Sequence, residues 1–303
     1  MPMRVKPPAD IAIDPPLVRA LLQEQHPDLA HLPLIDSGEG WDNTMFRLGD
    51  DLAVRVPRRA ASAALIEHEQ HWLSGLSRRL PLPIPVPVRV GRPGCGFPWS
   101  WSIVPWLPGR NALVAPPQDL ATTAAGLGRF LRALHQPAPE GAPRNPWRGV
   151  PLGARATMVQ ERLRQIDGLG DRVAILDLWE RVLSTPPWSG PPLWIHGDLH
   201  PGNLLVSDGR LSAVIDFGDL TAGDPATDLA VAWMLLPPPA RSTFRASAQG
   251  RVDPLDPLDD DTWMRARGWA LALGLAYLAN SADDAPMSAL GRATVDAALN
   301  DKS

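Results

Sequence analysis

The chain has 303 residues, 45% of them hydrophobic, so it can bury one large or two modest cores. A net charge of −4 without a basic tract argues against nucleic acid or an anionic membrane as a partner. Its single cysteine, Cys95, excludes an internal disulfide framework. Because we find neither a membrane-length apolar stretch nor the apolar core of a signal peptide, we expect a cytoplasmic globular protein.

The first hundred residues predict a helix followed by a small sheet. Asp14 precedes two prolines, a typical helix start in which the carboxylate caps the first turn. A second helix is expected over 61–77, where apolar residues repeat at helical spacing. Short apolar runs between turn residues predict strands at 32–35, 44–48, 52–56, 86–91 and 99–104.

A glycine-containing loop is expected between the first two strands, over residues 37–43. It contains Ser37, Gly38, Gly40 and Asn43. Glycine permits close approach and unusual backbone angles, so the amides of Gly38 and Gly40 can cradle an anion. A plain hairpin turn would give the same pattern.

The rest of the chain is mainly helical in pattern. Pro105–Gly109 interrupts the strands, and the proline clusters at 137–146 and 237–239 predict stiff connecting loops. Asp224-Pro225 marks a helix start. The acidic residues within 253–261 predict either a solvated helix start or attraction of a polycationic acceptor. Further helices are expected at 121–134, 155–166, 172–183, 262–278 and 286–299.

Two short segments carry the strongest functional signal. His-Gly-Asp-Leu-His-Pro-Gly-Asn begins at His196 and places Asp198 and Asn203 on a loop, because Pro-Gly interrupts regular structure. Asp-Phe-Gly begins at Asp216. Apolar runs on both sides of Ser207–Arg210 predict a β-hairpin that returns Asp216 beside Asn203.

Phosphoryl transfer from a nucleotide to a hydroxyl requires this set of side chains. The divalent metal on the triphosphate needs oxygen ligands, which Asp216 and Asn203 can supply. A carboxylate must also accept the hydroxyl proton, and Asp198 fits that role. The two segments therefore predict a magnesium-dependent phosphotransferase.

Two other interpretations of the first segment stay open. A strand end followed by a polar turn would produce His-Gly-Asp by chance. If the segment were a strand, His196, Asp198 and His200 would share one face, as in the metal site of a hydrolase, although no His or Cys cluster supports this.

His-Gly-Asp-x-x-x-x-Asn with a following Asp-Phe-Gly resembles the aminoglycoside and macrolide phosphotransferase family, which belongs to the protein-kinase-like superfamily. The resemblance extends over nearly the whole chain. It implies an α+β, two-lobed protein-kinase-like fold. A small lobe with an antiparallel sheet is expected at 1–104, a hinge at 105–112, and a large, mainly helical lobe at 113–303.

The resemblance also implies nucleotide-binding residues in the small lobe. In the family, a basic residue on the third strand holds the α- and β-phosphates, and a helix glutamate braces it. Arg55 and Glu69 occupy those places, with arginine instead of the usual lysine, and Glu67 is the alternative partner. The loop 37–43 corresponds to the glycine-rich cover over the phosphates.

Further roles follow from the same resemblance. The hinge implies adenine contacts at Val104 and Trp106, and Asp228 corresponds to the aspartate that braces the catalytic loop, with His196 as a second supporting residue. A plain ion pair between Arg55 and Glu69, and plain helix capping by Asp228, are the simpler alternatives.

We therefore expect transfer of the γ-phosphate of ATP or GTP, with Mg²⁺, to a hydroxyl of a small molecule, most readily an aminoglycoside-like or other antibiotic. A metabolite kinase of the homoserine, choline or ketosamine type and a nucleotide-binding pseudoenzyme are the alternatives. Protein acceptors are disfavoured, since no peptide-docking segment follows Asp216. The sequence leaves the acceptor, the nucleotide and the oligomeric state undetermined.

Overall fold

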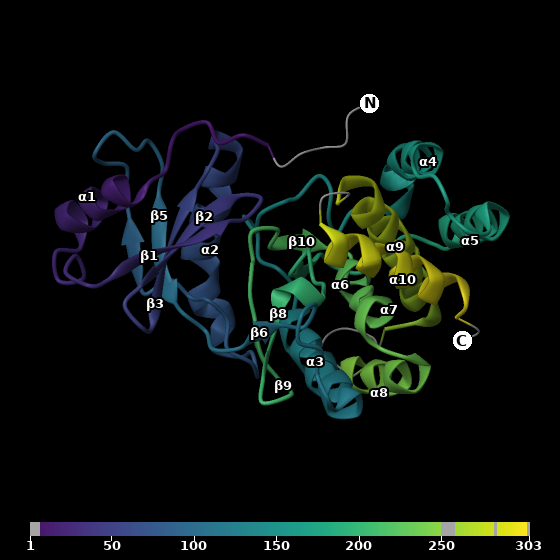
Figure 1. Ribbon diagram of the computed structural model, residues 1–303. Coiled ribbons are helices and arrows are strands. Elements are labelled where there is room, and N and C mark those ends of the chain that lie inside the picture. Colours follow the sequence, from purple (N-terminus) through teal and green to yellow (C-terminus); the bar gives the residue numbers. More distant parts are fainter. Residues whose placement is uncertain (1–6, 250–257, 282–283, 302–303) are drawn as a thin grey trace. The chain divides into compact units, whose positions relative to one another are not determined.

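The structure is a computed structural model that describes residues 7–249, 258–281 and 284–301. The chain divides into two compact units, whose helices and strands are labelled in Figure 1. The described part of the smaller unit comprises residues 7–108 and 213–218. The larger unit contains the other described residues. The segment with Asp216 therefore comes late in the sequence but belongs to the smaller unit, whose other residues all precede residue 109.

The smaller unit is built on a five-stranded antiparallel sheet with the order β1-β2-β3-β5-β4. The strands are β1 Leu34–Glu39, β2 Asn43–Leu48, β3 Leu52–Pro57, β4 Arg89–Gly91 and β5 Trp101–Pro105. Two helices pack on this sheet, α1 Pro15–Gln25 and α2 Ala60–Ser77.

Alternation along β3 separates the two faces of the sheet. Val54 and Val56 are fully buried in a hydrophobic cluster with α1. Arg55, between them, points the other way and meets Glu69 of α2. The period of two in Leu-Ala-Val-Arg-Val therefore places a charged side chain against α2 and the valines in the core.

Two predicted elements of the smaller unit have wrong boundaries. Strand β1 continues to Glu39 with an irregular register after Asp36, so the turn is only Gly40–Asp42 rather than a loop over 37–43. Strand β4 is limited to Arg89–Gly91 instead of 86–91. Pro85 and Pro87 lack the amide hydrogen that a sheet requires, which explains the shortening.

The larger unit is mainly helical, as expected. Its short strands are β6 Arg110–Asn111, β7 Leu193–Ile195, β8 Leu204–Ser207, β9 Arg210–Val214, which ends in the smaller unit, and β10 Thr221–Gly223. Its first helices are α3 Leu120–Leu134, α4 Ala156–Gln165 and α5 Arg172–Ser184, with short 3₁₀ turns at Leu152–Arg155 and Pro201–Asn203. The remaining helices are α6 Ala226–Leu229, α7 Val231–Leu235, α8 Pro238–Ala248, α9 Asp260–Asn280 and α10 Ala285–Leu299.

The hairpin predicted around residues 207–210 is confirmed as β8 and β9. Asp208 and Gly209 form its turn, with φ of 50° and 73°, as the two central residues of a type I′ turn require. The cluster 237–239 is wrong as a plain loop, because Pro238 and Pro239 occupy the first turn of α8, where the missing amide hydrogen has no cost.

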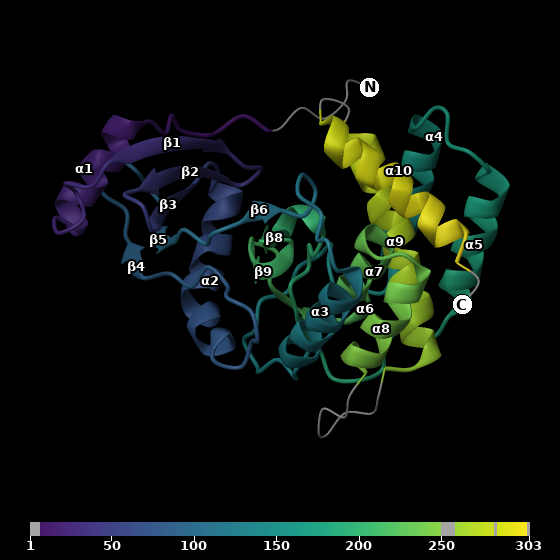
Figure 2. The ribbon, with the colours of Figure 1, turned by 60° about the horizontal axis from the view of Figure 1, so that its bottom comes forward.

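Helix α9 is the centre of the larger unit. It is buried along most of its length and contacts α4, α5, α6, α7 and α10, and Figures 1 and 2 both show α10 alongside it. Within the described ranges, no helix combines the length and apolarity needed to cross a membrane.

The close packing of α9 and α10 depends on two glycines. A Cβ added at Gly291 would lie 2.8 Å from the carbonyl oxygen of Gly274 and 2.9 Å from the backbone nitrogen of Leu278. Because these neighbours are backbone atoms, the helices would have to separate to accept a methyl group.

We therefore predict that Gly291→Ala lowers the free energy of unfolding by about 1–3 kcal/mol, as typical overpacking does. Gly126→Ala is the matched control, since Gly126 also lies inside a helix but a Cβ there meets nothing closer than 4.0 Å. The control should gain roughly 0.5–1 kcal/mol from helix propensity. Urea unfolding measures both, and equal changes in the two variants would contradict the packing argument.

Candidate active site

The loop that follows β7 is anchored by the fully buried carboxylate of Asp228. Its Oδ2 accepts a hydrogen bond of 2.8 Å from the amide of His196, and its Oδ1 one of 2.9 Å from the amide of Gly197. Nε2 of His135 lies 3.1 Å from the same Oδ2. Two backbone amides and an imidazole thus hold the first residues of the motif in one conformation.

Glycine is required at the second position of the motif. Gly197 has φ of 87°, in the left-handed region that favours glycine. A Cβ there would lie 2.3 Å from the carbonyl oxygen of Asp219. The loop therefore packs backbone to backbone against residue 219, which explains why His-Gly-Asp occurs here.

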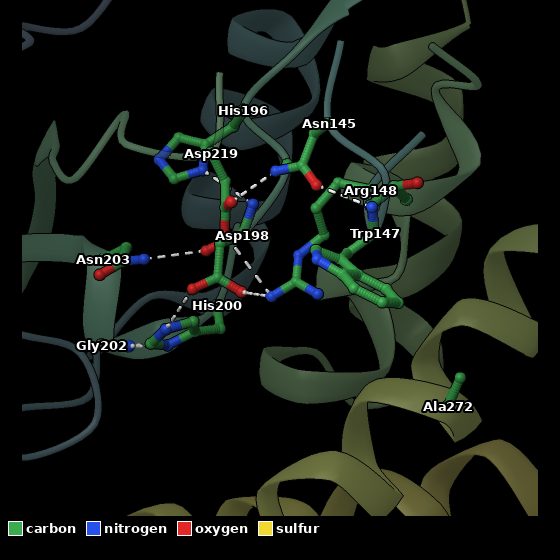
Figure 3. A network of polar contacts seen from close by, with 12 residues as sticks. Asn145, Trp147, Arg148, His196, Asp198, His200, Gly202, Asn203, Asp219 and Ala272 are labelled. Carbon is green, nitrogen blue, oxygen red and sulfur yellow. Dashed lines mark hydrogen bonds and ion pairs between the residues drawn. The ribbon is translucent and has the colours of Figure 1, made fainter. Parts of the chain in front are cut away.

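Asp198 follows and is held from several sides (Figure 3). Its Oδ1 lies 2.9 Å from Nη2 of Arg148, and its Oδ2 lies 3.5 Å from Nε2 of His200. The amide of Gly202 donates to Nδ1 of His200 at 3.0 Å, so in a neutral ring the hydrogen is on Nε2 and faces Asp198. The carboxylate therefore has a fixed orientation.

These contacts also keep Asp198 ionised. Burial alone would raise its pKa, but the positive charge of Arg148 and the hydrogen bond from His200 outweigh it and hold the pKa well below the usual range. At neutral pH the side chain is an acceptor that can orient a hydroxyl group.

Asn203 is fixed to the same loop. Its Nδ2 donates a hydrogen bond of 2.8 Å to the backbone carbonyl of Asp198, and the residue is 7% exposed. Since the amide nitrogen makes this bond, the carboxamide oxygen points away from it and is the atom that could bind a metal ion.

Three residues that shape this region were not predicted from the sequence: Asn145, Arg148 and Asp219. Nδ2 of Asn145 donates to Asp219 at 2.6 Å, and Nη2 of Arg148 lies 3.6 Å from Asp219 Oδ2. Asn145 lies in the proline-rich connector predicted at 137–146 and Arg148 lies just after its end, and a lone asparagine or arginine at such a place carries no specific signal. Only the fold brings Arg148 to Asp198.

The segment with Arg148 is fixed by the glycine that follows it. The amide of Gly149 donates to Thr227 at 3.1 Å, and its carbonyl accepts from Asp224 at 3.0 Å. A Cβ on Gly149 would lie 2.9 Å from the Cα of Gly223. This close approach fixes the position of the segment that carries Arg148.

In the smaller unit, Arg55 is the central charged group. It is 5% exposed and lies 2.5 Å from Glu69 Oε2 and 3.5 Å from Asp216 Oδ1. Burial would lower its pKa, but these carboxylates raise it above the ordinary value. Glu67, the alternative partner, instead accepts a hydrogen bond from Ser100.

Asp216 has an unusual backbone conformation for a residue with a side chain. Its φ is 63°, in the left-handed region, and its side chain is 57% exposed. Such conformations cost free energy and are common where a side chain must be aimed. The carboxylate is accessible while its backbone position is fixed.

The amides proposed as an anion cradle are already occupied. Gly38 donates to Asp36 Oδ1 at 2.8 Å, and Gly40 donates to the carbonyl of Asn43 at 2.7 Å. Ser37 Oγ accepts from the amide of Arg47 at 3.2 Å. An anion near this turn would therefore need other donors.

The two residues proposed for adenine binding have different environments. Val104 is 2% exposed and pairs with Ala53 in the sheet. The amide of Trp106 donates to the carbonyl of Asp51 at 2.7 Å, so it is not free for a base. The Trp106 indole is exposed, with the Arg47 guanidinium 5.0 Å from its ring centre.

The hydrolase interpretation loses its structural basis. Strand β7 ends at Ile195, before the alternating residues His196, Asp198 and His200 begin. No group of three or more His, Cys, Asp or Glu residues in the described part of the chain is arranged to hold a metal ion.

Comparison with known proteins identifies the family. A family model described as the phosphotransferase enzyme family matches residues 36–269. The chain belongs to this family. No curated protein sequence matches it significantly.

Solved structures of aminoglycoside and macrolide phosphotransferases have the same fold. A GDP complex of a mutant aminoglycoside 2′-phosphotransferase-IIIa has a TM-score of 0.70 at 21% identity, covering 94% of this chain and 97% of that chain. Macrolide 2′-phosphotransferase MphH from Brachybacterium faecium has 0.62 at 22%, with 92% and 96% covered. The streptomycin–ATP complex of APH(2″)-IIa has 0.59 at 16%, with 93% and 95% covered. The α+β, protein-kinase-like fold expected from the sequence is confirmed.

The role of Arg55 can be tested in a nucleotide titration. Arg55→Ala should weaken ATP binding, and Arg55→Lys should not restore it fully, because an ammonium lacks the planar fork of a guanidinium. Glu69→Ala should act in the same direction but less strongly. Arg89→Ala, which removes an exposed arginine from β4, is the control. Unchanged affinity in Arg55→Ala would mean that the phosphates are held by other residues.

Proposed function

We propose that the protein transfers the γ-phosphate of ATP or GTP to a hydroxyl group of a small molecule, with Asp198 as the proton acceptor. The proposal rests on one observation: the backbone and the carboxylate of Asp198 are both held in place by neighbouring residues. Asp228 anchors its loop, Asn203 binds its carbonyl and Arg148 orients its carboxylate. Membership of the phosphotransferase enzyme family supports the same reaction.

An ionised Asp198 suits this chemistry. Its low pKa makes it a weak base towards a free alcohol, but it can accept a hydrogen bond from the attacking hydroxyl and so orient it. The proton is transferred as the bond from oxygen to phosphorus forms, when the hydroxyl becomes acidic. Positioning then contributes more than basicity, as is typical of phosphoryl transfer.

We propose Asp216 and Asn203 as ligands for Mg²⁺. An accessible carboxylate and a carboxamide oxygen are hard donors that fit this ion. When bound, magnesium would neutralise charge on the phosphates. The joint assignment rests on the sequence motif, because Asn203 and Asp216 are described in different units.

We propose Arg55 as a phosphate-binding residue that Glu69 holds in place. A buried guanidinium with a glutamate on one side and an accessible carboxylate on the other has its position fixed before a nucleotide arrives. The complete set of Asp198, Asn203 and Asp216 argues for turnover rather than for a nucleotide-binding pseudoenzyme.

Antibiotics are the first acceptor class to test, because solved neighbours include a macrolide phosphotransferase and a streptomycin complex. A small-metabolite kinase is the second candidate. One observation favours it: Arg148 contacts both Asp198 and Asp219 and offsets one of their two negative charges, which reduces the attraction of this region for a polycationic acceptor.

Asp198→Asn should reduce turnover by roughly 10²–10⁴-fold, because the amide keeps the shape but cannot take the proton. Nucleotide affinity should change little. Asp177→Asn, an exposed substitution on α5, serves as the control. Nucleotide consumption measured across antibiotics and metabolites provides the assay, and near-normal turnover in Asp198→Asn would remove its assigned role.

Asp216→Ala should abolish most of the magnesium dependence of ATP binding, and Asn203→Ala should reduce it less, because a carboxylate carries the charge. Calorimetric titration of ATP with and without Mg²⁺ measures the difference. If Asp216→Ala and the parent respond equally to the metal, Asp216 is not a ligand.

A further inference from the structure

One buried arginine of the larger unit differs from the others. Five arginine residues are classed as buried in the described chain: Arg55, Arg58, Arg155, Arg265 and Arg267. Four of them bind oxygen atoms, from Glu69, Glu39, Asp224 and the carbonyl of Ala298. In contrast, Nη2 of Arg155 contacts only the sulfur of Met158 at 3.1 Å, and its Nη1 has no hydrogen-bond partner.

This arrangement is unfavourable without a ligand. Arg155 is 4% exposed, and a buried cation normally has an anionic or carbonyl partner because desolvation costs several kcal/mol. Burial and the nearby charge of Arg148 both lower its pKa. An oxyanion at Nη1 would supply the missing partner.

The neighbours of Arg155 lead to the catalytic carboxylate. Its guanidinium lies 5.3 Å from the ring centre of Trp147, whose side chain is exposed. Figure 3 shows Trp147 beside Arg148, and Arg148 in turn contacts Asp198. A ligand that covers Trp147 and reaches Arg155 would therefore place its other end near Asp198.

A second unpartnered polar group lies on the α9 side of Asp198. The hydroxyl of Tyr277 is buried without a hydrogen-bond partner, and its ring is 5.6 Å from the ring of His200. Burial, together with the charge of Asp198, raises its pKa well above the ordinary value, so the hydroxyl stays protonated. It can donate a hydrogen bond to an oxygen of a ligand.

We propose that Arg155 and Tyr277 form an oxyanion-binding acceptor subsite beside Asp198, so that the acceptor carries a carboxylate or a similar anionic group in addition to its hydroxyl. The proposal rests on the proposed function and narrows its substrate class. Both groups are hydrogen-bond donors, and both are unpartnered, so an oxygen-rich anion satisfies them whereas an ammonium group satisfies neither.

The described part of the acidic stretch at 253–261 does not support binding of a polycation. Asp259 caps α9 by accepting from the amide and hydroxyl of Thr262, and Asp260 pairs with Arg245. Asp253 and Asp256 lie outside the described residues. The helix-start interpretation therefore accounts for Asp259, and the attraction of cations lacks support from this segment.

Binding can be tested with three compounds that share a pyranose ring: glucuronate, glucose and glucosamine, which are anionic, neutral and cationic. A panel of simpler carboxylates, acetate and glycolate, extends the anionic arm. We expect carboxylates at millimolar concentration to raise the thermal unfolding temperature more than the other two classes, because a ligand stabilises the state that binds it.

The variants are Arg155→Met, Tyr277→Phe and, as a control in helix α4, which follows Arg155 directly, Arg164→Met, where the side chain is exposed. Arg155→Met should abolish carboxylate stabilisation, and Tyr277→Phe should weaken it several-fold. Both should be at least as stable as the parent without ligand, since each removes an unpartnered buried group. Arg164→Met should behave like the parent.

The outcomes separate the two proposals. Arg155-dependent carboxylate binding without phosphate transfer to any acceptor would keep the subsite and reject the proposed function. Transfer that favours glucosamine or streptomycin and ignores Arg155→Met would keep the function and reject the subsite. The subsite is also rejected if carboxylates give no stabilisation that depends on Arg155. It is rejected as well if Arg155→Met loses stability while its response to carboxylates is unchanged.

Discussion

The hydrogen bonds that Asp228 accepts from two backbone amides define the geometry on which the position of Asp198 depends. The carboxylate is fully buried, and within the described residues its hydrogen-bond partners are the amides of His196 and Gly197 and the ring of His135. Loss of one of these donors would leave a buried acceptor oxygen without a partner, so the turn from His196 to Gly197 has little freedom. Asp198 follows this turn directly, so its backbone position is fixed as well. The proposed phosphoryl transfer requires such a fixed position, because that reaction depends more on the placement of groups than on their basicity.

The smaller unit also buries an ionisable side chain, in this case the cation Arg55. Arg55 is buried on β3 between two core valines. It is tolerated there because Glu69 of α2 pairs with it. An arginine at this position therefore needs its helix partner even without a nucleotide. Structural compensation and a phosphate-binding role are compatible here, since a guanidinium has five donors and Glu69 does not occupy all of them.

Much of this arrangement was predictable from local sequence, and the failures have physical causes. Asp198, Asn203 and the hairpin after them follow from short-range patterns, because Pro-Gly and Asp-Gly determine the backbone locally. Arg148, Asp219 and Tyr277 were not found, since they approach Asp198 only through the packing of distant segments. Gly38 and Gly40 were predicted to cradle an anion because glycine has a flexible backbone. In the structure their amides donate instead to Asp36 and Asn43, which the backbone freedom of glycine alone does not reveal.

The assignment of residues 213–218 to the smaller unit has a practical consequence for dissecting the protein. An N-terminal fragment that ends at residue 108 would lack Asp216 next to Arg55 and the hydrogen bond from Val214 to Pro83. The complementary C-terminal fragment would carry those residues away from the sheet to which they belong. A single proteolytic cut therefore cannot release either unit intact, and isolating the smaller one would require a circularly permuted or two-chain form.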